Sequence, residues 1–167
     1  MSLPFQIYSF DPTTSKKLPG AAVIVLQEWW GVNDTIKRFA QNIADSTGAH
    51  AVVPDLYKGK IGVNAEEASH LMGKLDWEIA IGEIEQLIEQ LKSQGYNHIG
   101  SIGFCMGGGL SFALAVDSAK RNSPIQAAVG CYGTCPDNFD VSLIKDTAIQ
   151  GHFGGKDSVE GFSDPAT

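Results

Sequence analysis

The pentapeptide Gly-Phe-Cys-Met-Gly, residues 103–107, places Cys105 between two glycines. The apolar run 99–102 before it predicts a buried strand, and the apolar run 110–116 after it predicts a helix. An abrupt turn from strand to helix needs neighbours without side chains, which glycine provides. The sequence therefore predicts Cys105 on a strained corner at a helix N-terminus, where unpaired N–H groups favour the thiolate. The N–H of Met106 would point to where an oxyanion forms.

This pattern is typical of a nucleophile elbow with Cys in place of Ser. The alternative is a glycine-rich turn around a buried structural cysteine, since free Cys is often buried. The predicted strand before the motif and the helix after it favour the elbow. A phosphate-binding loop fits less well, because no Gly-Lys-Ser/Thr follows and the glycines lack the dinucleotide-binding spacing.

A second candidate group follows the β-branched run 21–26, which predicts a strand of a parallel sheet covered on both faces. Glu28, Trp29 and Trp30 come directly after it, at the end where open parallel sheets bind ligands. Charged residues are rarely buried unless paired, so Glu28 is a candidate site residue, with a solvated loop glutamate as the alternative. The two tryptophans either line an apolar pocket or simply pack.

A cysteine nucleophile needs a base and a group that orients the base. In the chain order of α/β-hydrolases the acid follows the nucleophile and the histidine comes last. Asp157, just after the predicted strand 147–153, occupies the acid's place, and a turn aspartate beside two glycines is the alternative. All four histidines precede Asp157: His50, His70, His98 and His152. None of them stands where the base is expected.

Predicted helices and strands alternate along the chain. The remaining strands are expected at 5–10, 49–53 and 125–131, and the remaining helices at 34–47, 65–74 and 76–94. This alternation predicts an α/β fold with a mostly parallel sheet and helices on both faces, in a single domain over 1–167. The glutamates of the helix 76–94 are expected on its solvated surface.

Composition narrows the class of protein. A net charge of −7 and a pI near 4.9 argue against nucleic acid or an anionic membrane as a partner. Three cysteines without framework spacing predict a reducing, cytoplasmic location, and neither a signal peptide nor an apolar run of membrane-spanning length is visible. Cys131 and Cys135 lack a second ligand pair, so no zinc or other metal is predicted.

Five stretches spread over nearly the whole chain resemble the dienelactone hydrolase family, carboxymethylenebutenolidase-like members of the α/β-hydrolases. They are Val25–Asn33, Val53–Tyr57, Gly103–Gly108, Gly130–Gly133 and His152–Asp157. The resemblance implies hydrolysis of a lactone or carboxylic ester without a cofactor. Cys105 would be the nucleophile and Asp157 the triad acid.

The resemblance also implies roles around the nucleophile. Glu28 would contact the resting Cys105 thiol and help to activate it when an anionic substrate binds. The backbone N–H groups of Met106 and Trp29 would form the oxyanion hole. Tyr132 would lie near the substrate pocket.

Two further substrate contacts are expected at Trp30 and Lys58. The family places a basic residue just past the Asp-Leu-Tyr motif to hold a substrate carboxylate. Gly59 stands at about that position, and Lys58 and Lys60 are the nearest basic residues.

The segment that carries the family's triad histidine has no counterpart, which predicts a C-terminally incomplete domain lacking the last helix–strand unit. Such a chain is expected to be weak or inactive alone and to form a homodimer through its exposed edge, unless a second chain supplies the histidine. Two alternatives remain. One is a non-catalytic pseudo-hydrolase binding module, and the other is a flavodoxin-like Cys hydrolase or glutaminase-type domain that pairs its elbow cysteine with a glutamate.

Overall fold

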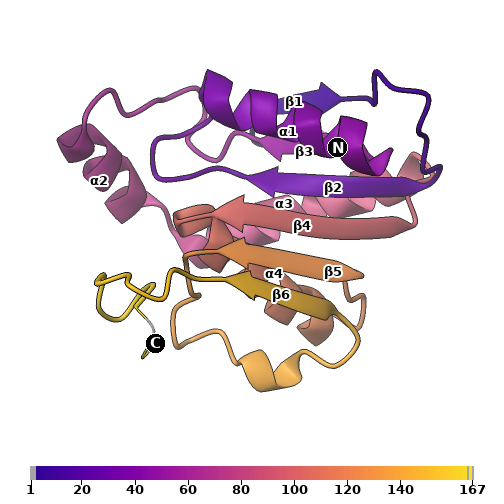
Figure 1. The fold of residues 1–167 in the computed structure, drawn as a ribbon. Helices are drawn as coiled ribbons and strands as arrows, with labels where there is room; N and C mark the ends of the chain where they lie inside the picture. The colour runs from indigo at the N-terminus through magenta and orange to yellow at the C-terminus, as the bar shows by residue number, and fades with distance from the viewer. Residues whose placement is uncertain (1–2, 165, 167) are drawn as a thin grey trace.

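A computed structural model, which describes residues 3–164 and 166, contains a six-stranded mixed sheet (Figure 1). The strands are β1 (Ile7–Phe10), β2 (Ala21–Leu26), β3 (His50–Pro54), β4 (His98–Phe104), β5 (Ala127–Cys131) and β6 (Ala148–His152). Their order is β1-β3-β2-β4-β5-β6, and only β1 runs antiparallel to its neighbour. The mostly parallel α/β sheet predicted from the alternation is thereby confirmed.

Helices cover both faces of this sheet. They are α1 (Asp34–Thr47), α2 (Ala65–Lys74), α3 (Trp77–Ser93) and α4 (Met106–Lys120), with a short 3-10 helix at Val141–Leu143. Helix α1 lies in front of the sheet in Figure 1, and α3 and α4 lie behind it. Each face has its own apolar core, so β2 and β3 are buried on both sides, as their continuous β-branched runs predict.

Local signals in the sequence set the ends of α1. The Asn33 side chain accepts hydrogen bonds from the N–H groups of Thr35 and Ile36, both at 3.1 Å, which satisfies two free donors of the first turn. Gly48 ends the helix in the left-handed conformation, with φ of 83°. The predicted span of 34–47 is confirmed.

Helix α4 is longer than its apolar run predicts, because it begins at Met106 instead of Leu110. Three glycines fill its first turn, and glycine is a poor helix former. They are kept there by close packing. A Cβ on Gly108 would lie 2.8 Å from the Cys131 carbonyl oxygen, and a Cβ on Gly109 would overlap the Thr134 carbonyl.

The glutamates of α3 do not all face solvent, contrary to expectation. Glu85 is only 5% exposed and packs between α3 and α4. Its position explains this burial. Ile81 lies four residues before Glu85 and Ile88 three after it, so all three share the buried stripe of the helix with Ile84.

Strand β6 forms one edge of the sheet and pairs only with β5 among the described residues. All five of its residues are exposed, including Ile149 at 48%. A free strand edge with apolar side chains favours pairing with another chain, and the self-association expected from the sequence stays a prediction. Within residues 3–164 no helix has the length and apolar character needed to cross a membrane.

Candidate active site

Cys105 lies on the corner between β4 and α4, at the carboxyl ends of the parallel strands. Its backbone has φ of 53° and ψ of −122°, a conformation that L residues rarely adopt. The turn fits because glycines surround it. A Cβ on Gly103 would overlap the Gly107 backbone, and a Cβ on Gly133 would overlap the Cys105 carbonyl oxygen. The Cys105 carbonyl accepts the first helical hydrogen bond from the N–H of Gly108 at 2.9 Å.

The Cys105 thiol is half-buried, and this burial raises its pKa above the usual range. The N–H of Met106 lowers that pKa, in the direction expected of a helix N-terminus, and the negative charge of Glu28 raises it. Because burial is the largest effect, the resting group is a thiol and not the thiolate that the helix terminus alone would favour.

Glu28 and Tyr132 are 104 residues apart in the sequence but are in contact in the fold. The Tyr132 hydroxyl donates a hydrogen bond to Oε1 of Glu28 at 3.0 Å. Burial raises the pKa of this tyrosine, and the Glu28 carboxylate and the nearby sulfur of Cys105 raise it further. The backbone of Tyr132 is held by its N–H, which donates to the His152 carbonyl at 2.7 Å. Cys105, Glu28 and Tyr132 therefore form one electrostatically coupled group.

The two tryptophans follow Glu28 in a tight turn. The Gly31 N–H donates to the Glu28 carbonyl at 3.1 Å, which closes the turn. The rings of Trp29 and Trp30 pack edge to face with centroids 5.0 Å apart, and both residues are partly buried. The Trp30 carbonyl accepts from the Gly62 N–H at 2.9 Å, so this turn is tied to the loop that follows β3.

Sequence reasoning missed the residue that joins the ends of β2 and β3. Gln27 is fully buried, and its Oε1 accepts from the Leu56 N–H at 3.1 Å. The Asp55 carboxylate accepts from the N–H groups of Tyr57 and Gly59, at 3.2 and 2.9 Å, and so shapes the loop. A glutamine ending a buried apolar strand was the available signal, because a buried amide needs a partner.

Tyr57 extends this loop to the elbow. Its hydroxyl donates to Sδ of Met106 at 3.4 Å, and the side chain is almost fully buried. Burial raises its pKa, and Cys105 contributes to the shift. Tyr57 therefore packs directly beneath the residue whose N–H faces the Cys105 sulfur.

Lys58 points toward α3. Its ammonium pairs with Oε1 of Glu83 at 3.2 Å, with side-chain exposures of 56% and 16%. Asp157 lies after β6, where its carboxylate accepts from the Val159 N–H at 3.0 Å within a turn. No hydrogen bond or ion pair among the described residues joins either side chain to Cys105.

No histidine among the described residues is hydrogen-bonded to Cys105 or Asp157. His50 instead binds Asp11, with 2.8 Å between Nδ1 and Oδ1, at the opposite ends of the strands. His152 is exposed at the end of β6. Within residues 3–164 no cluster of three or more His, Cys, Asp or Glu side chains has the geometry to hold a metal ion.

A mostly parallel sheet with an antiparallel edge strand, and a strained corner at Cys105 after a central strand, is consistent with the α/β-hydrolase fold. The parallel strands alone, β3-β2-β4-β5-β6, have the order that flavodoxin-like folds share. Strand order around β4 therefore does not discriminate between the two, and comparison with known proteins does.

The family model of the dienelactone hydrolase family matches residues 5–165. The carboxymethylenebutenolidase of Pseudomonas putida is 30% identical over 154 residues, which cover 84% of this chain and 62% of that protein. The same figures hold for the carboxymethylenebutenolidase of Pseudomonas knackmussii. A dienelactone hydrolase-like promiscuous phosphotriesterase from metagenomic libraries shares the fold, with a TM-score of 0.70 at 23% identity over 92% of this chain and 65% of its own. The chain belongs to the dienelactone hydrolase family.

The chain spans between about half and two thirds of the length of its curated relatives, from 53% to 67%. The part that the family model matches, residues 5–165, holds the elbow, the Glu28 turn and the strand that precedes Asp157. The flavodoxin-like alternative gains no support from these matches.

Proposed function

We propose that Cys105 attacks the carbonyl carbon of a small lactone or carboxylic ester. The observation that carries the proposal is the strained elbow, which presents the sulfur beside the Met106 N–H and within the electrostatic reach of Glu28. Carboxymethylenebutenolidase relatives support a lactone or ester as the substrate class. No step of this chemistry requires a metal or an organic cofactor.

In the proposed reaction the thiol proton passes to the Glu28 carboxylate as the sulfur bonds to the carbonyl carbon. The carbonyl oxygen becomes an oxyanion, held by the N–H groups of Met106 and Trp29. Collapse of this intermediate breaks the ester C–O bond, and the leaving oxygen takes up the proton that Glu28 holds, which returns Glu28 to its carboxylate form. Water then hydrolyses the thioester, which returns the thiol and releases a carboxylic acid. Asp157 would orient the base that activates this water.

Substrate would be held on the aromatic side of the elbow. Trp30 and Tyr132 would supply apolar and hydroxyl surface there, and the hydrogen bond from Tyr132 to Glu28, at 3.0 Å, supports this role for Tyr132. Lys58 would serve a substrate carboxylate only by leaving Glu83, which costs one partly exposed ion pair.

The experiment that tests the nucleophile is acyl labelling followed by mass spectrometry. A 4-nitrophenyl ester is expected to acylate Cys105, whereas Cys131 and Cys135, also partly buried, serve as comparisons within the same chain. Cys105→Ala is expected to remove the adduct. Labelling of Cys131 or Cys135 with Cys105 unmodified, or labelling of all three cysteines at the same rate, would contradict the proposal.

Turnover by the 167 residues alone is expected to be negligible. A nucleophile and its base act as a unit, and losing either costs on the order of 10⁶-fold in kcat in a hydrolase of this kind. No histidine among the described residues reaches the site. Steady-state hydrolysis of a dienelactone or aryl ester should therefore not exceed that of Cys105→Ala, and multiple turnovers lost in this variant would show the prediction to be wrong.

A second candidate function is ligand binding without chemistry, because no histidine among the described residues is hydrogen-bonded to Cys105 or Asp157. A lactone that binds saturably, leaves no adduct on Cys105 and binds equally well to Cys105→Ala would support it over the hydrolase.

A further inference from the structure

A groove runs between α3 and the end of α4, on the sheet face that α3 and α4 cover. Its volume is about 670 Å³. One stripe of α3, which includes Gly82, Glu85, Gln86 and Glu89, forms one wall, and Arg121 and Ser123 belong to the other. None of these residues belongs to the elbow or to the Glu28 turn.

Glu85 lines this groove although it is only 5% exposed. Its Oε1 is buried and has no hydrogen-bond partner among the described residues. A buried carboxyl oxygen without a donor is costly, and such groups are normally paired. Burial, with Asp117 and Glu89 nearby, raises the pKa of Glu85 to about 7.

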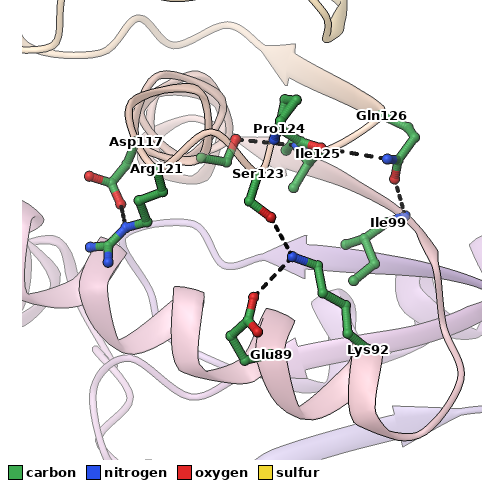
Figure 2. Close-up of polar contacts among 10 residues, drawn as sticks. Glu89, Lys92, Ile99, Asp117, Arg121, Ser123, Pro124, Ile125 and Gln126 are labelled. Carbon is green, nitrogen blue, oxygen red and sulfur yellow. Dashed lines mark hydrogen bonds and ion pairs between the residues drawn. The ribbon is translucent and has the colours of Figure 1, made fainter.

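Both neighbouring cations already bind other groups, as Figure 2 shows. Lys92 donates to Oε1 of Glu89 at 2.9 Å and to the Ser123 hydroxyl at 2.6 Å. Arg121 donates through Nε to Oδ2 of Asp117 at 2.6 Å. Their positive charges lower the pKa of Glu85, but neither side chain is hydrogen-bonded to it.

We propose that this groove binds a small organic ammonium ion, whose N–H groups donate to the Glu85 carboxylate where it lines the groove. Three carboxyl groups, Glu85, Glu89 and Asp117, face two cations, Lys92 and Arg121. When Glu85 is ionised, one further positive charge that carries N–H donors balances the charge and supplies the hydrogen bond that this carboxylate lacks. The two cations that act on Glu85 already donate to Asp117, Glu89 or Ser123.

The groove leaves room for such a ligand. A Cβ added to Gly82 meets nothing within 4 Å, so this wall is open and is not filled by a neighbouring side chain. Two side-chain amides and two hydroxyl groups also line the groove. Such walls suit a short alkyl chain with a polar end better than a long apolar ligand.

The test uses n-butylammonium as the probe, with n-butanol and tetramethylammonium as comparisons. NMR titration of the folded chain is expected to give saturable shifts at Gly82, Gln86 and Ser123, with a dissociation constant of about 1 mM. Butanol lacks the charge and tetramethylammonium lacks N–H donors, so each is expected to bind at least about tenfold more weakly.

Two comparisons between variants isolate the site. Glu85→Gln keeps the shape of the side chain and is expected to weaken binding at least about tenfold. Gly82→Leu should fill the groove and abolish binding, whereas Gly73→Leu, the same change at an equally open position of α2, should leave it intact. A circular dichroism spectrum confirms that each variant is folded.

The pH dependence supplies an independent readout. The ammonium ion binds the ionised carboxylate, so its affinity should rise at least about tenfold between pH 5.5 and pH 7.5 and then level off. In Glu85→Gln the affinity should not change with pH. Absence of saturable shifts, equal binding of butanol, or unaltered binding to Glu85→Gln would each overturn the proposal.

Discussion

Gly103→Ala is expected to prevent stable folding of the chain, or to lower its free energy of unfolding by about 3 kcal/mol or more. The added methyl group would overlap the backbone of Gly107 in the first turn of α4. Overlap with backbone is more costly than overlap with a flexible side chain, because relief requires that a whole element move.

The backbone around this corner cannot move to make room for the added methyl group. A Cβ on Gly107 would itself overlap the Leu26 carbonyl at the end of β2, so α4 cannot shift toward the sheet. Moving α4 away would separate Leu110 and Leu114, both fully buried, from the core. The strained backbone of Cys105 lies within the same turn, and its cost must be offset by this packing.

Urea denaturation followed by circular dichroism measures this effect. Gly82→Ala and Gly73→Ala are the controls, because both sit within helices where an added Cβ meets nothing. Each is expected to stabilise the protein by roughly 0.5–1 kcal/mol, since alanine is the better helix former. If Gly103→Ala unfolds at the same urea concentration as these controls, the close packing of the elbow is not what positions Cys105.

The elbow could be predicted from sequence because its constraints are local. A strand, a corner and a helix follow one another within about 20 residues, and glycine is the residue that such a corner requires. The same holds for α1, where Asn33 and Gly48 mark both ends, and for β2, whose apolar run shows burial on both faces.

The contacts of the site could not be predicted from sequence, because they join distant segments. The Tyr132–Glu28 hydrogen bond depends on β5 and β2 flanking β4 in the sheet, and no local pattern encodes that order. The place of Lys58 after the Asp-Leu-Tyr motif predicts a contact with substrate, and that contact stays a prediction. Its ion pair with Glu83 could not be predicted, because it depends on where α3 packs.

Glu85 is a different case, because periodicity alone places it on the buried stripe of α3. Glutamate is usually exposed, so its residue type predicts a solvent-exposed side chain, and this prediction is wrong for Glu85. An α-helix has 3.6 residues per turn, so residues three or four apart lie on the same face. Glu85 lies at this spacing from Ile81 and Ile88, which pack into the core, and is buried with them.

This burial gives a sharp expectation for stability against pH. The pKa of Glu85 is raised in the folded state to about 7, from an ordinary value of 4.5. A raised carboxyl pKa means that the folded state binds the proton more tightly than the unfolded state does. The contribution of Glu85 to stability is therefore complete below pH 4.5 and is lost as the pH rises toward 7, by an amount on the order of 3 kcal/mol.

Glu85→Gln isolates this contribution, because the variant has no proton to lose at that position. The difference in unfolding free energy between wild type and Glu85→Gln, from urea denaturation, should move by about 3 kcal/mol in favour of the variant between pH 4.5 and pH 7.5. Glu66→Gln, the same change on the exposed surface of α2, controls for the substitution itself. A constant difference across this range would mean that water reaches the Glu85 carboxylate freely. The groove would then lack the buried carboxylate that is proposed to recognise a cation.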